Sequence, residues 1–217
     1  NEYSDAHDHF YWNDKAQNYK YDIRDYENTR PLYENVDYVF HTAAEARIQP
    51  AILNPIESVS INAVGTCTVL QCAREANIKR LIYSSTSSAY GRNNFPNVEE
   101  QPEDCLTPYS VSKVCGEKLC KMYTELYGLP TIIFRYFNVY GPGQDLDNLK
   151  QGMVSIYLSQ FFNNKFKKVL VKGSKNRFRD FCYIDDAVNI TIKSIKDQRF
   201  NNKVINVGTG KKTTVQD

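Results

Sequence analysis

Residues 80–84 read RLIYS, residues 107–128 read TPYSVSKVCGEKLCKMYTELYG, and residues 131–137 read TIIFRYF. The first and third segments are short, apolar and contain β-branched or aromatic residues, which indicates two buried strands. The segment between them opens with Thr-Pro, a helix start signal, and ends at Gly128, the residue type that commonly caps a helix. The stretch therefore predicts a strand, a long helix and a second strand, and this order decides the fold.

The same alternation extends to both sides of this stretch. Residues 36–41 predict a strand, and apolar residues near helical spacing predict a helix over 54–77. Further along the chain we expect a helix over 153–162, a strand over 168–172, a helix over 185–195 and a strand over 204–207. Strands that alternate with helices of ten or more residues imply a parallel sheet covered on both faces. We therefore predict an α/β, doubly wound fold, with a loop and at most a short helix over residues 1–20.

In a sheet of this kind, ligands bind beyond the carboxyl ends of the strands. Three segments follow predicted strands at that edge: Thr42-Ala43-Ala44, Ser84 to Ser88, and Tyr136-Phe137-Asn138. We therefore expect the chemistry of the protein at these segments.

The composition is that of an ordinary soluble globular protein. The 217 residues are 41% hydrophobic and 24% charged, and the net charge of +2 gives no reason to expect nucleic acid or an acidic membrane as a partner. The sequence shows no signal peptide and no long apolar span. Its six cysteines form no CxxC pair, and those within apolar helical patterns behave as small buried hydrophobes. A reduced, cytoplasmic protein is the simplest interpretation.

Tyr109 and Lys113 lie four residues apart on the helix predicted from Thr107, so they share one face. A tyrosine has a pKa of about 10 and is a poor base at neutral pH. A lysine ammonium nearby favours the phenolate, lowers that pKa and brings the hydroxyl into range for proton transfer. Tyr-x-x-x-Lys alone is a weak signal, since a solvent-facing Tyr and Lys on an amphipathic helix give the same pattern.

A run of hydroxyl side chains, from Ser84 to Ser88, lies about twenty residues before Tyr109. A hydroxyl at a strand end can hydrogen-bond both a substrate hydroxyl and Tyr109, which aligns the proton for removal. An ordinary hydroxyl-rich turn would have the same sequence.

Six segments taken together are more specific than any one of them. They are His41-Thr42-Ala43-Ala44, Tyr83 to Gly91, Thr107 to Lys113, Arg135 to Pro142, Arg179-Asp180-Phe181 and Asn206-Val207-Gly208. In this order and spacing the set resembles the extended short-chain dehydrogenases, and within them the NAD-dependent sugar-nucleotide epimerases and dehydratases. The resemblance runs from about Tyr21 to the end of the chain and is nearest to UDP-glucose and UDP-N-acetylglucosamine 4-epimerases.

The resemblance implies a Rossmann-like fold and three catalytic residues. Tyr109 would be the base, Lys113 would lower its pKa and bind the nicotinamide ribose, and Thr86 occupies the catalytic Ser/Thr position. Residues 1–145 would form a partial NAD-binding Rossmann domain. Residues 146–217 would form part of a small substrate-binding lobe together with returning Rossmann elements.

The resemblance also implies which residues contact NAD. Asp22 and Ile23 match the pair that meets the adenine, the backbone of Ala43 and Ala44 lies against the cofactor, and Asn62 supports the cofactor loop. The full set of implied cofactor-binding residues is Asp22, Ile23, Ala43, Ala44, Asn62, Ser84, Tyr109, Lys113 and Tyr136.

A UDP-sugar would contact a second, overlapping set of residues. Ser87 and Ser88 would line the sugar, Asn138 would meet the diphosphate, and Arg179 would clamp it, a use suited to bidentate guanidinium geometry. A surface ion pair with Asp180 is the alternative for Arg179. The full set of implied substrate-binding residues is Thr86, Ser87, Ser88, Tyr109, Asn138 and Arg179.

No glycine precedes Gly65, so the glycine-rich pyrophosphate loop of such enzymes has no counterpart in the chain. We therefore expect a fragment that lacks a first unit of roughly 30 residues and part of the C-terminal lobe, and that is inactive by itself. His7 and His9 form a His-x-His beside two aspartates, but no further ligand is evident, so we expect no metal.

The implied reaction is transient oxidation at C4 of a hexose to a 4-keto sugar, followed by hydride return to the other face. Related dehydratases carry an Asp-Glu pair directly after the catalytic Thr, and related decarboxylases carry a Glu nearby. Ser87 and Ser88 stand in this place and cannot act as an acid at neutral pH, so epimerisation is favoured. A dehydratase or decarboxylase and a non-catalytic dinucleotide-binding module are the alternatives. We further expect a homodimer that pairs through the helices at 54–77 and 107–127, with NAD as cofactor.

Overall fold

The computed structural model describes residues 13–144, 146, 152–163, 168–171 and 173–217. Its centre is a parallel sheet with the strand order β1-β2-β3-β7. The strands are β1 (Tyr38–His41), β2 (Arg80–Thr86), β3 (Thr131–Tyr136) and β7 (Lys203–Val207). All three pairings between neighbouring strands are parallel, which confirms the predicted sheet.

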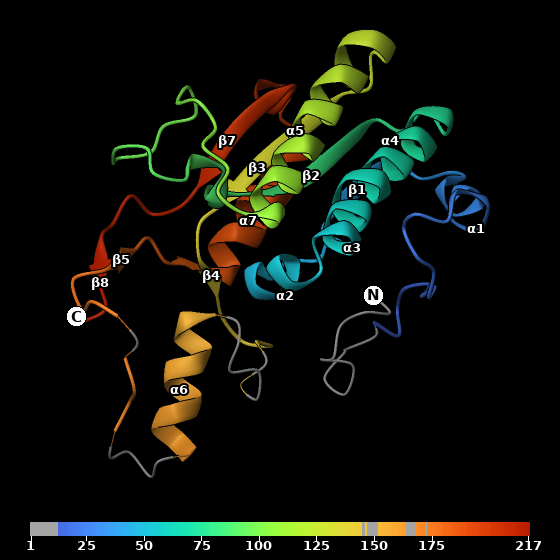
Figure 1. Cartoon of the computed structure of the whole chain (residues 1–217). Coiled ribbons are helices and arrows are strands. Elements are labelled where there is room, and N and C mark those ends of the chain that lie inside the picture. The colour runs from blue at the N-terminus through green and yellow to red at the C-terminus, as the bar shows by residue number, and fades with distance from the viewer. Residues whose placement is uncertain (1–12, 145, 147–151, 164–167, 172) are drawn as a thin grey trace.

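Helices cover both faces of this sheet (Figure 1). Helices α4 (Gly65–Glu75) and α5 (Pro108–Tyr127) pack on one face, where Leu81, Tyr83 and Ile133 form the core with residues of both helices. Helix α7 (Ile184–Ser194) packs on the other face, against Ile82 and the alternate residues of β3. Alternation along a strand sends successive side chains to opposite faces, so the near-continuous apolar runs serve two cores. The doubly wound α/β fold is therefore confirmed.

The helix predicted over 54–77 is a continuous helical segment with a wider turn at its centre. It consists of α3 (Pro55–Val59), the π-helical turn η3 (Ser60–Val64) and α4. A side chain on Gly65 would collide with Ile23, whose Cδ1 lies 2.5 Å from where a Cβ would stand. Gly65 thus lets the segment around Ile23 lie directly against the helix.

The remaining long elements match the sequence, with ends that differ by one or two residues. Helix α5 begins with a capping box between Thr107 and Ser110 and ends at Gly128, which adopts the left-handed conformation (φ 70°). Helix α6 (Met153–Asn163) and helix α7 fall where helices are expected.

The strand expected over 168–172 is absent from its described residues, 168–171, and Lys172 lies outside the described residues. The backbone N–H of Leu170 donates instead to the side-chain carbonyl of Gln160 on α6, at 2.6 Å. An apolar, β-branched segment becomes a strand only where another strand accepts its hydrogen bonds. This segment has a side-chain partner in place of a strand, so the prediction is wrong.

Short elements escape sequence patterns because they contain fewer than two periods of their helix or, for most of them, of their strand. They are α1 (Tyr26–Thr29), η2 (Arg30–Tyr33), α2 (Ile48–Leu53), η4 (Ser87–Tyr90), β4 (Val139–Tyr140), β5 (Phe178–Arg179), β6 (Cys182–Tyr183), η5 (Gln198–Phe200) and β8 (Thr213–Thr214). Strands β4 and β6 pair in parallel, and β5 pairs antiparallel with β8.

Among the described helices, none combines the length and apolar character needed to cross a membrane.

Candidate active site

Helix α5 carries Tyr109 and Lys113 in its first two turns. The Thr107 hydroxyl accepts from the Ser110 N–H at 3.1 Å, and the Ser110 hydroxyl accepts from the Thr107 N–H at 3.0 Å. This reciprocal cap fixes the start of the helix, with Pro108 at its first position, and therefore fixes where Tyr109 lies relative to the sheet.

Lys113 is a buried cation with an aromatic neighbour. Its side chain is 3% exposed, and Nζ lies 4.3 Å from the centre of the Tyr83 ring. Burial lowers the pKa of Lys113 to about 8, although the charge of Glu117 acts in the opposite direction. Within the described chain no acceptor hydrogen-bonds to Nζ, so its donors are available for a ligand. This arrangement fits the hydroxyl groups of a nucleotide ribose.

Tyr109 is half-buried, and burial raises its pKa above the ordinary value, with hydrogen bonding to Thr86 as the opposing influence. The sequence-based expectation was that Lys113 lowers this pKa. In the protein chain the desolvation of the phenol outweighs the hydrogen bond from Thr86, and the expected effect of Lys113 on this pKa stays a prediction.

Thr86 ends β2 and is 6% exposed. Its hydroxyl accepts from the Ser88 N–H at 3.1 Å and thereby caps the short helix η4, which holds Ser87 and Ser88. The structure thus brings Thr86 and Tyr109 together and places the two half-buried serines directly after them.

Asn62 lies in the π-helical turn η3 and holds the loop that follows β1. Its side chain accepts from the Glu45 N–H at 2.8 Å, donates to the Glu45 carbonyl at 3.0 Å, and donates to the Ser112 hydroxyl at 3.0 Å. The loop that contains Ala43 and Ala44 is therefore tied to the same part of α5 that carries Lys113. A π turn is a common feature of functional sites, and here it is the turn that presents Asn62.

Asp22 is bound within the chain. The Arg24 guanidinium donates to both carboxylate oxygens and holds the pKa of Asp22 below its ordinary value. Arg24 also binds Glu57 and Ser60, which connects this segment to α3 and η3. The carboxylate of Asp22 is therefore committed to an ion pair, and its backbone and Ile23 are the parts that remain for a ligand.

Ser84 and Tyr136 line a pocket on the α7 face of the sheet. The pocket has a volume of about 440 Å³, and its lining residues are Phe40, Thr42, Ser84, Tyr136, Val139, Ile184, Ala187, Val188, Thr191 and Ile192. The Tyr136 hydroxyl is within 2.5 Å of the Thr191 hydroxyl, so it is held toward α7. A mostly apolar pocket with a few hydroxyl groups is typical of a site that binds a small molecule.

Asn138 is hydrogen-bonded to Asp180, the residue that follows Arg179 in the chain. The Asn138 side chain donates to the Asp180 carbonyl at 2.9 Å. Among the described residues Arg179 forms no ion pair with Asp180, whose carboxylate accepts instead from Thr209 and the Gly210 N–H. The exposed guanidinium of Arg179 donates to the Phe178 carbonyl.

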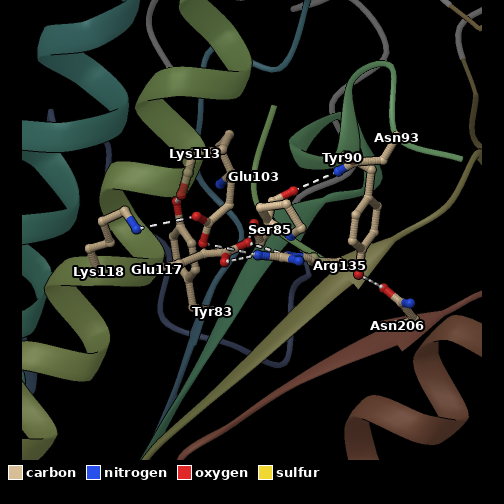
Figure 2. Close-up of polar contacts among 11 residues, drawn as sticks. Tyr83, Ser85, Tyr90, Asn93, Glu103, Lys113, Glu117, Lys118, Arg135 and Asn206 are labelled. Atoms are coloured by element: carbon tan, nitrogen blue, oxygen red, sulfur yellow. Dashed lines mark hydrogen bonds and ion pairs between the residues drawn. The ribbon is translucent and has the colours of Figure 1, made fainter. Parts of the chain in front are cut away.

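The sequence analysis assigns no role to Glu117, Arg135 and Ser85, which form a buried polar network near Lys113 (Figure 2). Ser85 directly precedes Thr86 on β2. A signal was available: Glu117 follows Lys113 at the spacing by which Lys113 follows Tyr109, so all three share one inward face.

The described residues contain no cluster of three His, Cys, Asp or Glu side chains that could hold a metal ion. His7 and His9 lie outside the residues that the structure describes.

Comparisons with known proteins bear on this geometry. Residues 3–208 match the NAD dependent epimerase/dehydratase family. The chain is 33% identical to a putative UDP-glucose 4-epimerase of Methanocaldococcus jannaschii over 94% of its own length and 66% of that protein. It is 33% identical to a UDP-glucuronate 4-epimerase of Thermodesulfobacterium geofontis, over 91% of its length and 60% of that protein. The crystal structure of Thermotoga maritima UDP-glucose 4-epimerase with UDP-glucose matches with a TM-score of 0.88 and 31% identity, over 94% of this chain and 66% of that one.

Proteins named as a dehydratase and as a decarboxylase match at 30% and 32% identity. The chain spans 57–66% of the length of the first three curated relatives.

Proposed function

Because the chain belongs to the NAD dependent epimerase/dehydratase family, we propose that it epimerises a sugar nucleotide, a UDP-hexose or UDP-N-acetylhexosamine, at C4 through a transient 4-keto sugar. The observation that carries the proposal is the segment after Thr86. The short helix η4 carries the half-buried Ser87 and Ser88 directly after Thr86, in the place where elimination would need a carboxylic acid. Epimerisation needs only one base and a cofactor that accepts a hydride and then returns it.

NAD, the cofactor of this family, would supply the hydride acceptor and donor for C4 of the sugar, and the residues named below would hold it. Tyr109 accepts the proton of the 4-hydroxyl, and Thr86 aligns that hydroxyl. Burial keeps the phenol of Tyr109 protonated at neutral pH, so its reactive form depends on a positive charge nearby. Lys113 supplies that charge and holds the nicotinamide ribose through its free donors.

The other implied contacts follow the same proposal. The loop of Ala43 and Ala44, held by Asn62, lies against the cofactor, as do the backbone near Asp22 and the side chain of Ile23. Ser84 and Tyr136 flank the nicotinamide in the pocket beside α7. Ser87 and Ser88 contact the sugar, and Asn138 and Arg179 contact the diphosphate.

We also propose how the protein is organised. Residues 1–145 belong to the NAD-binding domain, and residues 146–217 contribute to the substrate lobe and return β7 to the main sheet. A cytoplasmic location is supported by six cysteines that are all free.

The test is turnover by the full-length protein. NAD is supplied with UDP-glucose, UDP-N-acetylglucosamine or UDP-glucuronate, products are resolved by NMR, and Tyr109→Phe is the control variant. We expect an equilibrium mixture of C4 epimers from one of these sugars, and a loss of at least about 10²-fold in rate in Tyr109→Phe. A stable keto-deoxy sugar or a pentose would replace the epimerase by a dehydratase or decarboxylase. NAD binding without turnover of any sugar nucleotide would support the binding module.

A further inference from the structure

A buried polar cluster lies behind the candidate active site and has no role in the proposed chemistry. At its centre, Arg135 Nε lies 2.9 Å from Glu117 Oε1 and Arg135 Nη2 lies 2.7 Å from Glu117 Oε2. The two side chains are 2% and 1% exposed, and the Ser85 hydroxyl donates to Glu117 Oε1 at 2.5 Å. We call Glu117, Arg135 and Ser85 the bridge.

Stability is a poor explanation for the bridge. A buried ion pair loses its hydration, and an apolar pair of similar volume often stabilises a fold as well or better. Arg135 Nη1 is buried without a hydrogen-bond partner, which adds a further cost. The guanidinium carbon of Arg135 lies 4.8 Å from the centre of the Tyr90 ring, a contact that restores part of the lost solvation.

The location of the bridge suggests another role. Ser85 directly precedes Thr86, Arg135 directly precedes Tyr136, and Glu117 is one helical turn after Lys113. The bridge therefore joins β2, β3 and α5 next to Thr86 and Lys113 in the chain, and Figure 2 shows its three side chains together with Lys113. Tyr90, at the end of η4, extends the cluster to Asn206 on β7 at 2.7 Å.

We propose that Glu117 and Arg135 are positioning residues, which hold α5 against β2 and β3 so that Tyr109 and Lys113 stand in register with Thr86. Two parallel N–H···O bonds resist both sliding and rotation of the helix, which a single contact would permit. The reaction at this site is proposed above, and the positioning role rests on it. A displacement of about 1 Å at such a site costs on the order of 10²-fold in rate.

Glu117 also acts on Lys113 through its charge. Its carboxylate raises the pKa of Lys113 against the effect of burial. The other titratable groups that face this region come from several elements. Glu103 lies 3.6 Å from Arg135 and binds Lys118. The remaining ones are His41 on β1, Tyr83 on β2, Tyr90 on η4, Cys105 before α5, and Tyr109 and Cys120 on α5. Removal of the Glu117 charge therefore lowers the pKa of Lys113 further and brings the alkaline loss of activity to lower pH.

The experiment compares wild type, Glu117→Gln, Arg135→Lys and the control Glu75→Gln in the full-length protein. Glu75 is the last residue of α4, and Glu75→Gln removes its ion pair with Arg30 of η2, away from the site. We expect Glu117→Gln to lower kcat by about 10²-fold with little change in KM. The alkaline limb of its kcat–pH profile moves to lower pH. Its circular dichroism spectrum and its affinity for NAD match those of the wild type. Arg135→Lys keeps one contact with Glu117, so it should retain part of the wild-type kcat. The control Glu75→Gln should change none of these quantities.

A folded Glu117→Gln variant with the kcat and pH profile of the wild type would overturn the positioning role. So would a loss of kcat that only follows a loss of folded protein. If the wild type itself turns over no sugar nucleotide, the proposed function is wrong, but the positioning role of the bridge can still be tested. Amide hydrogen exchange of residues 109–113 is then the measurement. Faster exchange in Glu117→Gln than in Glu75→Gln supports positioning, and equal exchange overturns it.

Discussion

The buried ammonium of Lys113 destabilises the folded protein, and the sign of this effect can be worked out. Its folded pKa of about 8 lies below the ordinary lysine value of 10.5, so the folded protein releases the proton first as the pH rises. The destabilisation is fully present below about pH 8 and is relieved between about 8 and 10.5. The shift corresponds to about 3 kcal/mol in the free energy of unfolding.

We therefore expect Lys113→Met to raise the free energy of unfolding at pH 7 by up to about 3 kcal/mol while it abolishes turnover. At pH 10 the stability difference from the wild type should be small, because the folded wild type has already lost the proton. Urea denaturation at both pH values measures this, and Lys121→Met, an exposed lysine on the same helix, is the control. Equal stabilisation at pH 7 and pH 10 would show that the charge is not the cause.

At the scale of elements, the π-helical turn η3 joins three parts of the molecule through Asn62. Asn62 is 1% exposed and makes hydrogen bonds to the loop after β1 and to α5. Asn62→Ala leaves the Glu45 N–H and carbonyl without these partners, which costs about 1–3 kcal/mol.

We expect Asn62→Ala to weaken NAD binding and to speed amide exchange over residues 42–47, because the loop loses its attachment. Calorimetric titration with NAD and hydrogen exchange measure the two effects. Asn94→Ala, at an exposed position, is the matched control. Unchanged exchange in the loop would mean that its conformation is set by other contacts.

Local signals account for the elements that could be predicted from the sequence. Thr107, Pro108 and Gly128 mark both ends of α5 within the helix itself, so the prediction needed no tertiary information. The prediction of a strand over 168–172 is wrong because β-branched residues do not indicate whether a partner strand is present. The turn η3 shifts the helical spacing by a single residue, too little for an apolar pattern to reveal.

The sequence predicts which strand ends and which helix face carry the candidate site. It does not predict the contacts between the side chains there. The bond between Arg135 and Glu117 joins a strand to a helix 18 residues away in sequence, and no spacing rule connects the two. The rise in the pKa of Tyr109 depends on how much water the folded chain removes, which also cannot be read from the sequence.

For the whole molecule, apolar side chains are exposed on the outer sides of α3 and α5. Ile56 is 83% exposed and Val111 is 50% exposed. A pocket of about 490 Å³ on α5, lined by Val111, Leu119 and Met122 among others, is almost entirely apolar. Exposed apolar side chains on these helices are typical of association sites and support the homodimer that we propose through them.

We expect the full-length protein to sediment as a dimer and the double variant Ile56→Glu and Val111→Glu to sediment as a folded monomer, because four charges would face one another across the two-fold interface. Analytical ultracentrifugation measures this. Lys121→Glu, which changes charge at an exposed position of α5, is the control. A wild-type monomer at micromolar concentration would end the dimer proposal.

The pairing of β3 with β7 brings together residues that are distant along the chain. Ile132 pairs with Lys203, so 71 residues (203 minus 132) must be synthesised before this edge of β3 is covered. At about 5–20 residues per second, translation takes on the order of 4–14 seconds over this interval. During that time the nascent chain displays an uncovered, apolar strand edge, the kind of surface that chaperones bind and that aggregates when they do not.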